Sequence, residues 1–384
     1  MTQPIAYHAS RIFDGERFHE DAALLVNDGS ITGILPRARV PAEFQVVEAE
    51  GLIVPGFVDL QVNGGGGVLF NNDPTADGIR TICAAHAKYG TTALMVTLIT
   101  DTPAVRDMAL DAGRSAAEAQ VPGYLGLHLE GPHLSVARKG THDPSLIREM
   151  TAGDLAALTS AAGTFGVAKT TIAPENVTAD QVRALVAAGY HVSLGHTDCN
   201  AETAFAYVEA GATLVTHIFN AMSQLQNREP GLVGAALSAP ELHCGLIADG
   251  HHVDWTTTAV AMRAKVGPGR IFVVTDAMSC IGTEEETFTL NGRTIYRRDG
   301  RLTLADGTLA GADIDMLACL RLVHERLELS LEEALRMVAL YPAHAIGADS
   351  KGHLSEGADA DFVVLTDDLR LRSTWIGGTC VHSA

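Results

Sequence analysis

The chain has 384 residues, of which 47% are hydrophobic and 19% are charged, and its formal net charge is −19. This composition excludes a disordered chain and suffices for one large domain, or for one large and one small domain. Because the field of such an acidic protein repels polyanions, nucleic acid and acidic membranes are not expected as partners. A small phosphorylated ligand needs only a few local donors and is not excluded.

The cysteines and the N-terminal segment bear on the compartment. Six cysteines are scattered along the chain without a CxxC pair, so reduced thiols are expected. The N-terminal segment lacks the apolar stretch of a signal peptide, and no run approaches the ~20 apolar residues of a membrane span. We therefore expect a cytoplasmic protein.

The two ends of the chain share one sequence pattern. The first fifty residues alternate short strand-like runs with Gly and Asn-Asp-Gly turn signals, which is typical of antiparallel β structure. The tail from about Gly352 repeats this pattern. We predict that residues 1–54 and 350–384 pair into one small β-sandwich domain.

The central region, residues 55–349, alternates apolar runs with Ala-rich helical segments. Eight runs are visible: "LIVPGFVDLQV", "TTALMVTLIT", "GYLGLHLE", "AKTTIAP", "YHVSLGH", "ATLVTH", "HCGLIAD" and "RIFVVTDA". This alternation predicts an α/β fold of the (β/α)8 TIM type, with a doubly wound open sheet as the alternative. Residues 221–231 and 279–307 are expected to be loops or a β insertion.

Five of these runs carry an ionisable residue at an equivalent place near their C-terminal end: Glu130, His196, His217, Asp249 and Asp276. The carboxyl ends of barrel strands carry the functional residues of this fold. One carboxylate and two imidazoles, from Glu130, His196 and His217, form a sensible ligand set for Zn²⁺ or a similar ion, with open positions for water or substrate. Asp276 is then placed to act as the base. For His128, on the same strand face as Glu130, a structural or hydrogen-bonding role is preferred to a ligand role.

The first barrel strand ends in Gln61-Val62-Asn63, where many metal-dependent hydrolases carry two histidines. An amide is a weak ligand and cannot neutralise charge, so a second ion is not expected there. Gln61 and Asn63 are expected to hydrogen-bond water or to frame the pocket. The glycines at 64–67 lack a following GK[ST], so close backbone packing is expected rather than a phosphate loop.

Several motifs together resemble one family. The motifs are "PGFVDLQVNGGGG", "HLEGPHL", "KGTHDP", "GHTDCNAETA", "THIFNAM", "IADGHHVD", "VTDAM" and "LAGA". They occur in the order seen in N-acetylglucosamine-6-phosphate deacetylases of the amidohydrolase superfamily, and the resemblance covers nearly the whole chain. Family members with Gln-x-Asn in the first strand work with a single metal.

The resemblance implies a role for each matching position. Glu130, His196 and His217 correspond to the metal ligands, Asp276 to the catalytic acid and base, and His142 to the histidine that reaches the scissile acetamide carbonyl. The positions that hold the sugar phosphate correspond to Asn220, Ala221, Arg228 and His252, beside Gln61 and Asn63 in the pocket. The implied cofactor is one divalent ion, Zn²⁺ first, with Fe²⁺, Mn²⁺ and Co²⁺ as alternatives. The implied partner is a phosphorylated amino sugar, and the implied assembly is a homodimer in which Arg228 reaches the neighbouring site.

This sequence departs from the family at three places, of which the third is Asp198 and Cys199, just after His196. Ala312 replaces a common serine, and His133 replaces a bulky apolar residue, which is expected to alter the pocket wall; Asp198, Cys199 and His251 have no assigned role. The implied reaction is deacetylation of N-acetylglucosamine 6-phosphate. The alternatives are a deacetylase for N-acetylgalactosamine 6-phosphate, a cyclic-amide hydrolase and a non-catalytic barrel. The non-catalytic barrel is disfavoured because Glu130, His196, His217 and Asp276 are all present.

Overall fold

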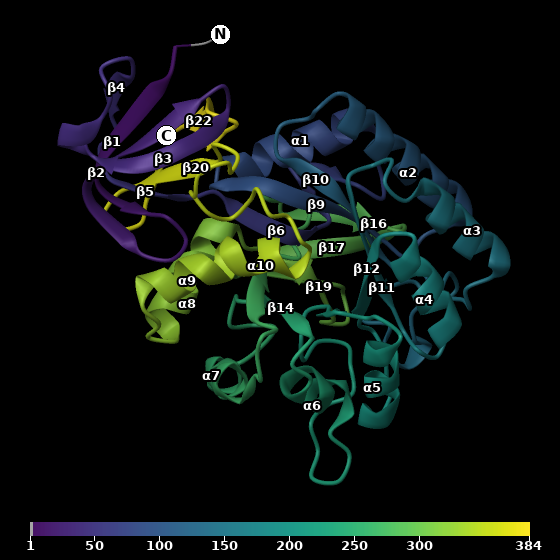
Figure 1. The fold of residues 1–384 in the computed structure, drawn as a ribbon. Coiled ribbons are helices and arrows are strands. Elements are labelled where there is room, and N and C mark those ends of the chain that lie inside the picture. Colours follow the sequence, from purple (N-terminus) through teal and green to yellow (C-terminus); the bar gives the residue numbers. More distant parts are fainter. Residues whose placement is uncertain (1–2) are drawn as a thin grey trace.

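The computed structural model describes residues 3–384 and shows a barrel with a small β domain beside it (Figure 1). Eight parallel strands form the barrel sheet in the order β15-β14-β13-β12-β11-β10-β9-β6. The strands are β6 (Phe57–Val62), β9 (Thr91–Ile99), β10 (Tyr124–Glu130), β11 (Val167–Ile172), β12 (Tyr190–Leu194), β13 (Leu214–Val215), β14 (His243–Ile247) and β15 (Ile271–Val274). At the carboxyl ends of β15 and β6, the Asp276 amide donates to the Gln61 carbonyl at 3.0 Å and the Asn63 amide to the Ala277 carbonyl at 2.8 Å. These bonds close the sheet, and the predicted barrel is confirmed.

Helices follow the strands and cover the outside of the barrel. They are α1 (Ala76–Ala87), α2 (Pro103–Glu118), α3 (Ala152–Ala161), α4 (Ala179–Ala187), α5 (Ala201–Glu209), α6 (Gly231–Ser238), α7 (Trp255–Ala264), α8 (Met316–Arg326), α9 (Leu331–Val338) and α10 (Leu340–Ala345). Threonines cap the first four, and Thr151 and Thr178 form reciprocal capping boxes with Asp154 and Gln181. The helix starts are thus fixed by local sequence.

The N- and C-terminal segments build one sheet, in the order β22-β21-β20-β5-β1-β2-β3 with β4 also paired to β1. Its strands are β1 (Ile5–Phe13), β2 (Phe18–Asn27), β3 (Ser30–Pro36), β4 (Gln45–Glu48), β5 (Leu52–Pro55), β20 (Phe362–Leu365), β21 (Leu371–Ile376) and β22 (Thr379–Ser383). Strands β1 and β21 are separated by two strands, yet the rings of Tyr7 and Trp375 lie 4.9 Å apart. The sheet therefore folds over its own core, as expected for a small sandwich.

The predicted antiparallel pairing in the first fifty residues is confirmed for β1, β2 and β3 and was wrong for β4. Strand β1 pairs in parallel with both β4 and β5. The reason is topological: β2 pairs with one edge of β1 and β3 pairs with β2, and the chain then crosses to the opposite edge of β1. We propose that the two domains divide near residues 54 and 350, where the chain passes between this sheet and the barrel.

A second β unit lies between β15 and α8. It comprises β16 (Thr287–Leu290), β17 (Arg293–Arg298), β18 (Arg301–Thr303) and β19 (Leu309–Ala312), paired antiparallel in chain order. Leu290, Ile295 and Leu302 pack with Met278 and Ile99 near the carboxyl ends of the barrel strands. We refer to residues 287–312 as the β insertion.

Two smaller features bear on the sequence expectations. β7 (Gly64–Gly65) pairs with β8 (Val68–Leu69), and a Cβ on Gly64 would lie 2.4 Å from the Val68 carbonyl oxygen, so the glycine run serves close backbone packing. No helix within residues 3–384 is long and apolar enough to span a membrane.

Candidate active site

A cavity of about 380 Å³ opens at the carboxyl ends of the barrel strands. Nine residues singled out from the sequence line it: Asn63, Glu130, His142, His196, His217, Asn220, Ala221, His252 and Asp276. Gln61 lies buried just behind the wall, and Arg228 is not part of the lining. The fold therefore brings together residues that are separated by up to about two hundred positions in sequence.

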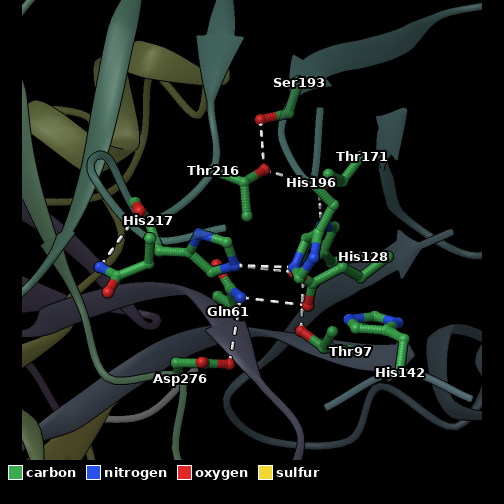
Figure 2. A network of polar contacts seen from close by, with 12 residues as sticks. Gln61, Thr97, His128, His142, Thr171, Ser193, His196, Thr216, His217 and Asp276 are labelled. Atoms are coloured by element: carbon green, nitrogen blue, oxygen red, sulfur yellow. Dashed lines mark hydrogen bonds and ion pairs between the residues drawn. The ribbon is translucent and has the colours of Figure 1, made fainter. Parts of the chain in front are cut away.

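Three possible ligand atoms, from Glu130, His196 and His217, lie close together in the lining of this cavity, and Figure 2 shows the rings of His196 and His217 pointing toward each other. Glu130 Oε1 lies 3.1 Å from the Nε2 atoms of both His196 and His217, and these two nitrogens are 3.0 Å apart. Ligand atoms of a tetrahedral Zn²⁺ site, each about 2.0–2.2 Å from the metal, lie roughly 3.3 Å from one another. The triangle is slightly tighter than that and has the right shape for one ion.

The hydrogen bonding of His196 supports a metal in the triangle. Its Nδ1 lies 2.8 Å from the Arg138 carbonyl oxygen, which can only accept, so Nδ1 carries the proton of the neutral ring. Nε2 then presents a lone pair to the carboxylate of Glu130, and two facing lone pairs need a cation between them. Burial opposes ionisation of Glu130, yet the imidazoles of His196 and His217 beside it hold its pKa well below the usual range. The donor set fits a divalent ion.

His142 also lies near the triangle. One of its nitrogens falls within 4.8 Å of ligand atoms of Glu130 and His196, and its ring centroid is 4.4 Å from that of His196. The Nδ1 atom of His142 is 2.7 Å from the Thr100 hydroxyl. Burial lowers the pKa of His142 well below the usual value, so the ring is neutral. Because His217 Nε2 lies 3.0 Å from His196 Nε2 and 3.1 Å from Glu130 Oε1, we propose His217 as the third ligand.

Asp276 faces the triangle and is held by two amides. Asn63 Nδ2 donates to Asp276 Oδ1 at 2.7 Å, and Gln61 Nε2 lies 3.0 Å from the same oxygen and 3.1 Å from Glu130 Oε2. Burial and then the charge of Glu130 raise the pKa of Asp276. A carboxylate with a raised pKa is suited to accept a proton and return it.

The backbone at these positions is unusual. His196, His217 and Asp276 have φ values of 48°, 28° and 51°, and each lies two residues beyond the end of its strand. Left-handed conformations in residues other than glycine cost on the order of 1 kcal/mol and cluster at functional sites. A passive scaffold has no reason to hold three strained residues around one cavity.

The Gln61 and Asn63 amides lead to a testable expectation. Both side-chain amides donate hydrogen bonds to carboxylates at the position where a second metal would need ligands. We therefore do not expect a second metal to bind there. Wild-type protein should contain one metal ion per chain by inductively coupled plasma mass spectrometry, and Gln61→His with Asn63→His should raise this toward two when excess Zn²⁺ is supplied. Two ions per chain in the wild type would contradict this account of the strand.

Asp249, the fifth strand-end residue, orients His252 rather than lining the cavity. Its Oδ2 atom is 2.6 Å from His252 Nδ1, and its Oδ1 accepts the His252 amide at 2.9 Å. Burial opposes ionisation, but the hydrogen bond with His252 keeps the pKa of Asp249 below its usual range. Because Nδ1 of His252 contacts Asp249, only Nε2 is available to contact a ligand.

Comparison with known proteins identifies the group to which this site belongs. Residues 52–381 match the model described as Amidohydrolase family. The chain belongs to the amidohydrolase family. It is 40% identical over 370 residues to N-acetylgalactosamine-6-phosphate deacetylase of Shewanella sp. (strain ANA-3), covering 95% of this chain and 93% of that protein. It is 35% identical to N-acetylglucosamine-6-phosphate deacetylase of Haemophilus influenzae, covering 93% and 94%.

A solved structure agrees with this assignment. The crystal structure of N-acetylglucosamine-6-phosphate deacetylase from Pasteurella multocida superposes with a TM-score of 0.94 at 33% identity, covering 99% of this chain and 100% of that one. The resemblance inferred from the sequence motifs is confirmed, and the protein is a metal-dependent amidohydrolase.

Several residues singled out from the sequence do not line the cavity of this amidohydrolase. Arg228 is exposed in the loop before α6 and does not line the cavity of its own chain. His133 is buried outside the cavity with Nδ1 3.0 Å from the Arg148 carbonyl oxygen, so it does not alter the pocket wall. Ala312 is also outside the lining, and its backbone amide donates to the Asp276 carbonyl at 2.9 Å. His128 has both nitrogens near threonine hydroxyls, which is a structural arrangement.

Sequence reasoning missed four residues that support the site. Arg138 orients His196 through its carbonyl group and pairs through its guanidinium with Asp198, while Thr100 contacts His142. Lys169 of β11 is buried inside the barrel, where Nζ donates to the Leu60 carbonyl at 3.1 Å and burial lowers its pKa to about 8. A lysine within the apolar run "AKTTIAP" was the available signal. Asp59 is fully buried as well, and burial raises its pKa to about 7.

Proposed function

We propose that this amidohydrolase hydrolyses the acetamide of N-acetyl-D-glucosamine 6-phosphate to D-glucosamine 6-phosphate and acetate. The observation that carries the proposal is the placement of Asp276 opposite the Glu130–His196–His217 triangle in one cavity. The names of the relatives support an N-acetylated amino-sugar phosphate as the substrate class.

Each residue has a distinct task in the proposed reaction. A divalent ion held by Glu130, His196 and His217 would supply Lewis acidity, which lowers the pKa of water and polarises a carbonyl. Asp276 takes the proton of the attacking water and returns it to the departing nitrogen, because an amide anion is too poor a leaving group. Asn63 and Gln61 orient the Asp276 carboxylate for both transfers. When the Thr100 hydroxyl donates to Nδ1, His142 presents an Nε2 proton to the acetamide oxygen.

The epimer N-acetylgalactosamine 6-phosphate is the second candidate substrate. The 40% identity to an N-acetylgalactosamine-6-phosphate deacetylase, against 35% to the Haemophilus influenzae protein, favours considering it. Acetate release should be compared for the 6-phosphates of N-acetylglucosamine, N-acetylgalactosamine and N-acetylmannosamine, with the unphosphorylated sugars as controls. The highest kcat/KM is expected for the glucosamine epimer. A higher value for the galactosamine epimer would favour the second candidate.

The metal and the compartment complete the proposal. A carboxylate with two imidazoles suits Zn²⁺, which we propose as the native ion ahead of Fe²⁺, Mn²⁺ and Co²⁺. All six cysteines are free, which supports a reducing compartment such as the cytoplasm.

Arg228 supplies the prediction on phosphate recognition. Since it is exposed and outside its own cavity, we propose that it reaches the phosphate of a neighbouring subunit in a homodimer. Arg228→Ala should raise KM for the phosphorylated sugar about tenfold or more, because a charge-assisted pair contributes about 1.5–3 kcal/mol. KM for the unphosphorylated sugar should change little.

A matched control for Arg228 is Arg183→Ala, which removes another exposed arginine, on α4. An unchanged KM for the phosphorylated sugar in Arg228→Ala would remove this residue from the site. Sedimentation of the wild type as a monomer under assay conditions would exclude its acting across an interface.

A further inference from the structure

The β insertion contacts the loop that carries His142. Arg293 is the first residue of β17, directly after the turn that joins β16 to β17, and its guanidinium donates to the Thr141 carbonyl at 2.5 Å. Thr141 immediately precedes His142 in sequence and also lines the cavity. A residue 152 positions away along the chain therefore holds the peptide next to a candidate catalytic imidazole.

The surroundings of Arg293 show what this side chain is doing. Within residues 3–384 its guanidinium forms no ion pair, whereas the nearby Arg297 of β17 pairs at 2.8 Å with Asp313, the residue directly after β19. The Nε atom of Arg293 is buried and has no hydrogen-bond partner among the described residues. Among residues 3–384, the Thr141 carbonyl is the one hydrogen-bond acceptor of this guanidinium, so the side chain joins the β insertion to the His142 loop.

The His142 loop needs such an anchor. Residues 139–143 belong to no helix or strand, and the loop turns through a hydrogen bond from the His142 amide to the Lys139 carbonyl at 3.0 Å. On the side chain, Thr100 contacts only Nδ1 of His142. Fixing the Thr141 carbonyl restricts the backbone from which the imidazole projects, and hence the position of Nε2 in the cavity.

We propose that Arg293 is a positioning residue for the deacetylation: through Thr141 it holds His142 at the acetamide carbonyl, so that the β insertion completes the active site. The inference rests on the function proposed above. A displacement of about 1 Å at a reacting group can cost on the order of 100-fold in rate, and the loss of supporting contacts around metal sites typically costs about 10–100-fold.

The first test compares Arg293→Met and Arg293→Lys with the control Arg298→Met, which removes an exposed arginine from the same strand. Arg293→Met should lower kcat about 10–100-fold, with KM and metal content within about threefold of the wild type. Arg293→Lys should recover part of the loss because lysine can donate to the same carbonyl, and Arg298→Met should match the wild type. The proposal would be overturned if Arg293→Met lost its bound metal or showed a raised KM while kcat stayed at the wild-type value.

The second test is a double-mutant cycle with His142→Ala. If Arg293 acts through His142, Arg293→Met should change the rate of the His142→Ala protein by less than about twofold. Equal losses in both backgrounds, or a His142→Ala protein as active as the wild type, would overturn the proposal.

Hydrogen exchange of a peptide covering residues 139–146 gives a readout without catalysis. The exchange should be faster in Arg293→Met than in the wild type, and an unchanged rate would count against the role of Arg293 in anchoring the loop. Failure of the proposed function itself is distinct, since the wild type would then release no acetate.

Discussion

Replacing Asp276 with asparagine is expected to lower kcat for deacetylation about 1,000-fold, which lies within the range for loss of a general acid and base. Asparagine keeps the size of the side chain, but it can neither take the proton of water nor deliver one to the amine. The Asn63 and Gln61 amides that now donate to Asp276 Oδ1 can still donate to the new carbonyl oxygen. The fold of the site should therefore be preserved.

Metal content separates this chemical role of Asp276 from a structural one. The Asp276→Asn protein should retain one metal ion per chain and a KM close to that of the wild type. Asp111→Asn, which changes an exposed carboxylate on α2, serves as the control and should be fully active. Activity within tenfold of the wild type in Asp276→Asn would remove Asp276 from the mechanism.

The second large effect concerns the identity of the third metal ligand. His217→Ala should weaken metal binding by at least about 100-fold, because even outer contacts of a metal site contribute about 10–100-fold. Acetate release should fall with the bound metal. His142→Ala should keep its metal and lose turnover only, because His142 is assigned to the substrate carbonyl. Both proteins can be measured by metal analysis after dialysis against buffer of fixed free Zn²⁺.

The pair is informative because His142 also lies within 4.8 Å of ligand atoms of Glu130 and His196. If His142→Ala loses the ion and His217→Ala keeps it, the ligands are Glu130, His142 and His196. The oxyanion would then lack the donor assigned to it, and His217, whose pKa is raised by Glu130 against the effect of burial, would need another role.

Much of this architecture could be predicted because its causes are local. Each barrel strand is an apolar run that ends at a polar residue, and residues such as Glu130 and His196 must meet where parallel strands end. Thr151 and Thr178 cap their helices through side chains three residues away. Such short-range patterns are legible in one sequence without a structure.

The features that could not be predicted from the sequence depend on contacts between segments that are distant along the chain. The Arg138 carbonyl sets the tautomer of His196 from 58 positions away, and a backbone acceptor leaves no trace in residue type. Arg293 reaches Thr141 only because the β insertion folds back over the barrel. The parallel pairing of β1 with β4 and β5 likewise follows from a chain crossing that alternation cannot reveal. Arg228 lies outside its own cavity, and its predicted role at the site of a neighbouring subunit stays a prediction.

The most direct test of the account is acetate release from N-acetylglucosamine 6-phosphate by one protein sample in three states: as purified, after removal of metal with a chelator, and after addition of one equivalent of Zn²⁺ per chain. Acetate and free amine should appear in equal amounts in the first state, fall to background in the second and return in the third. Deacetylation that persists in protein shown to contain no metal, or no acetate release from protein with one ion bound, would contradict it.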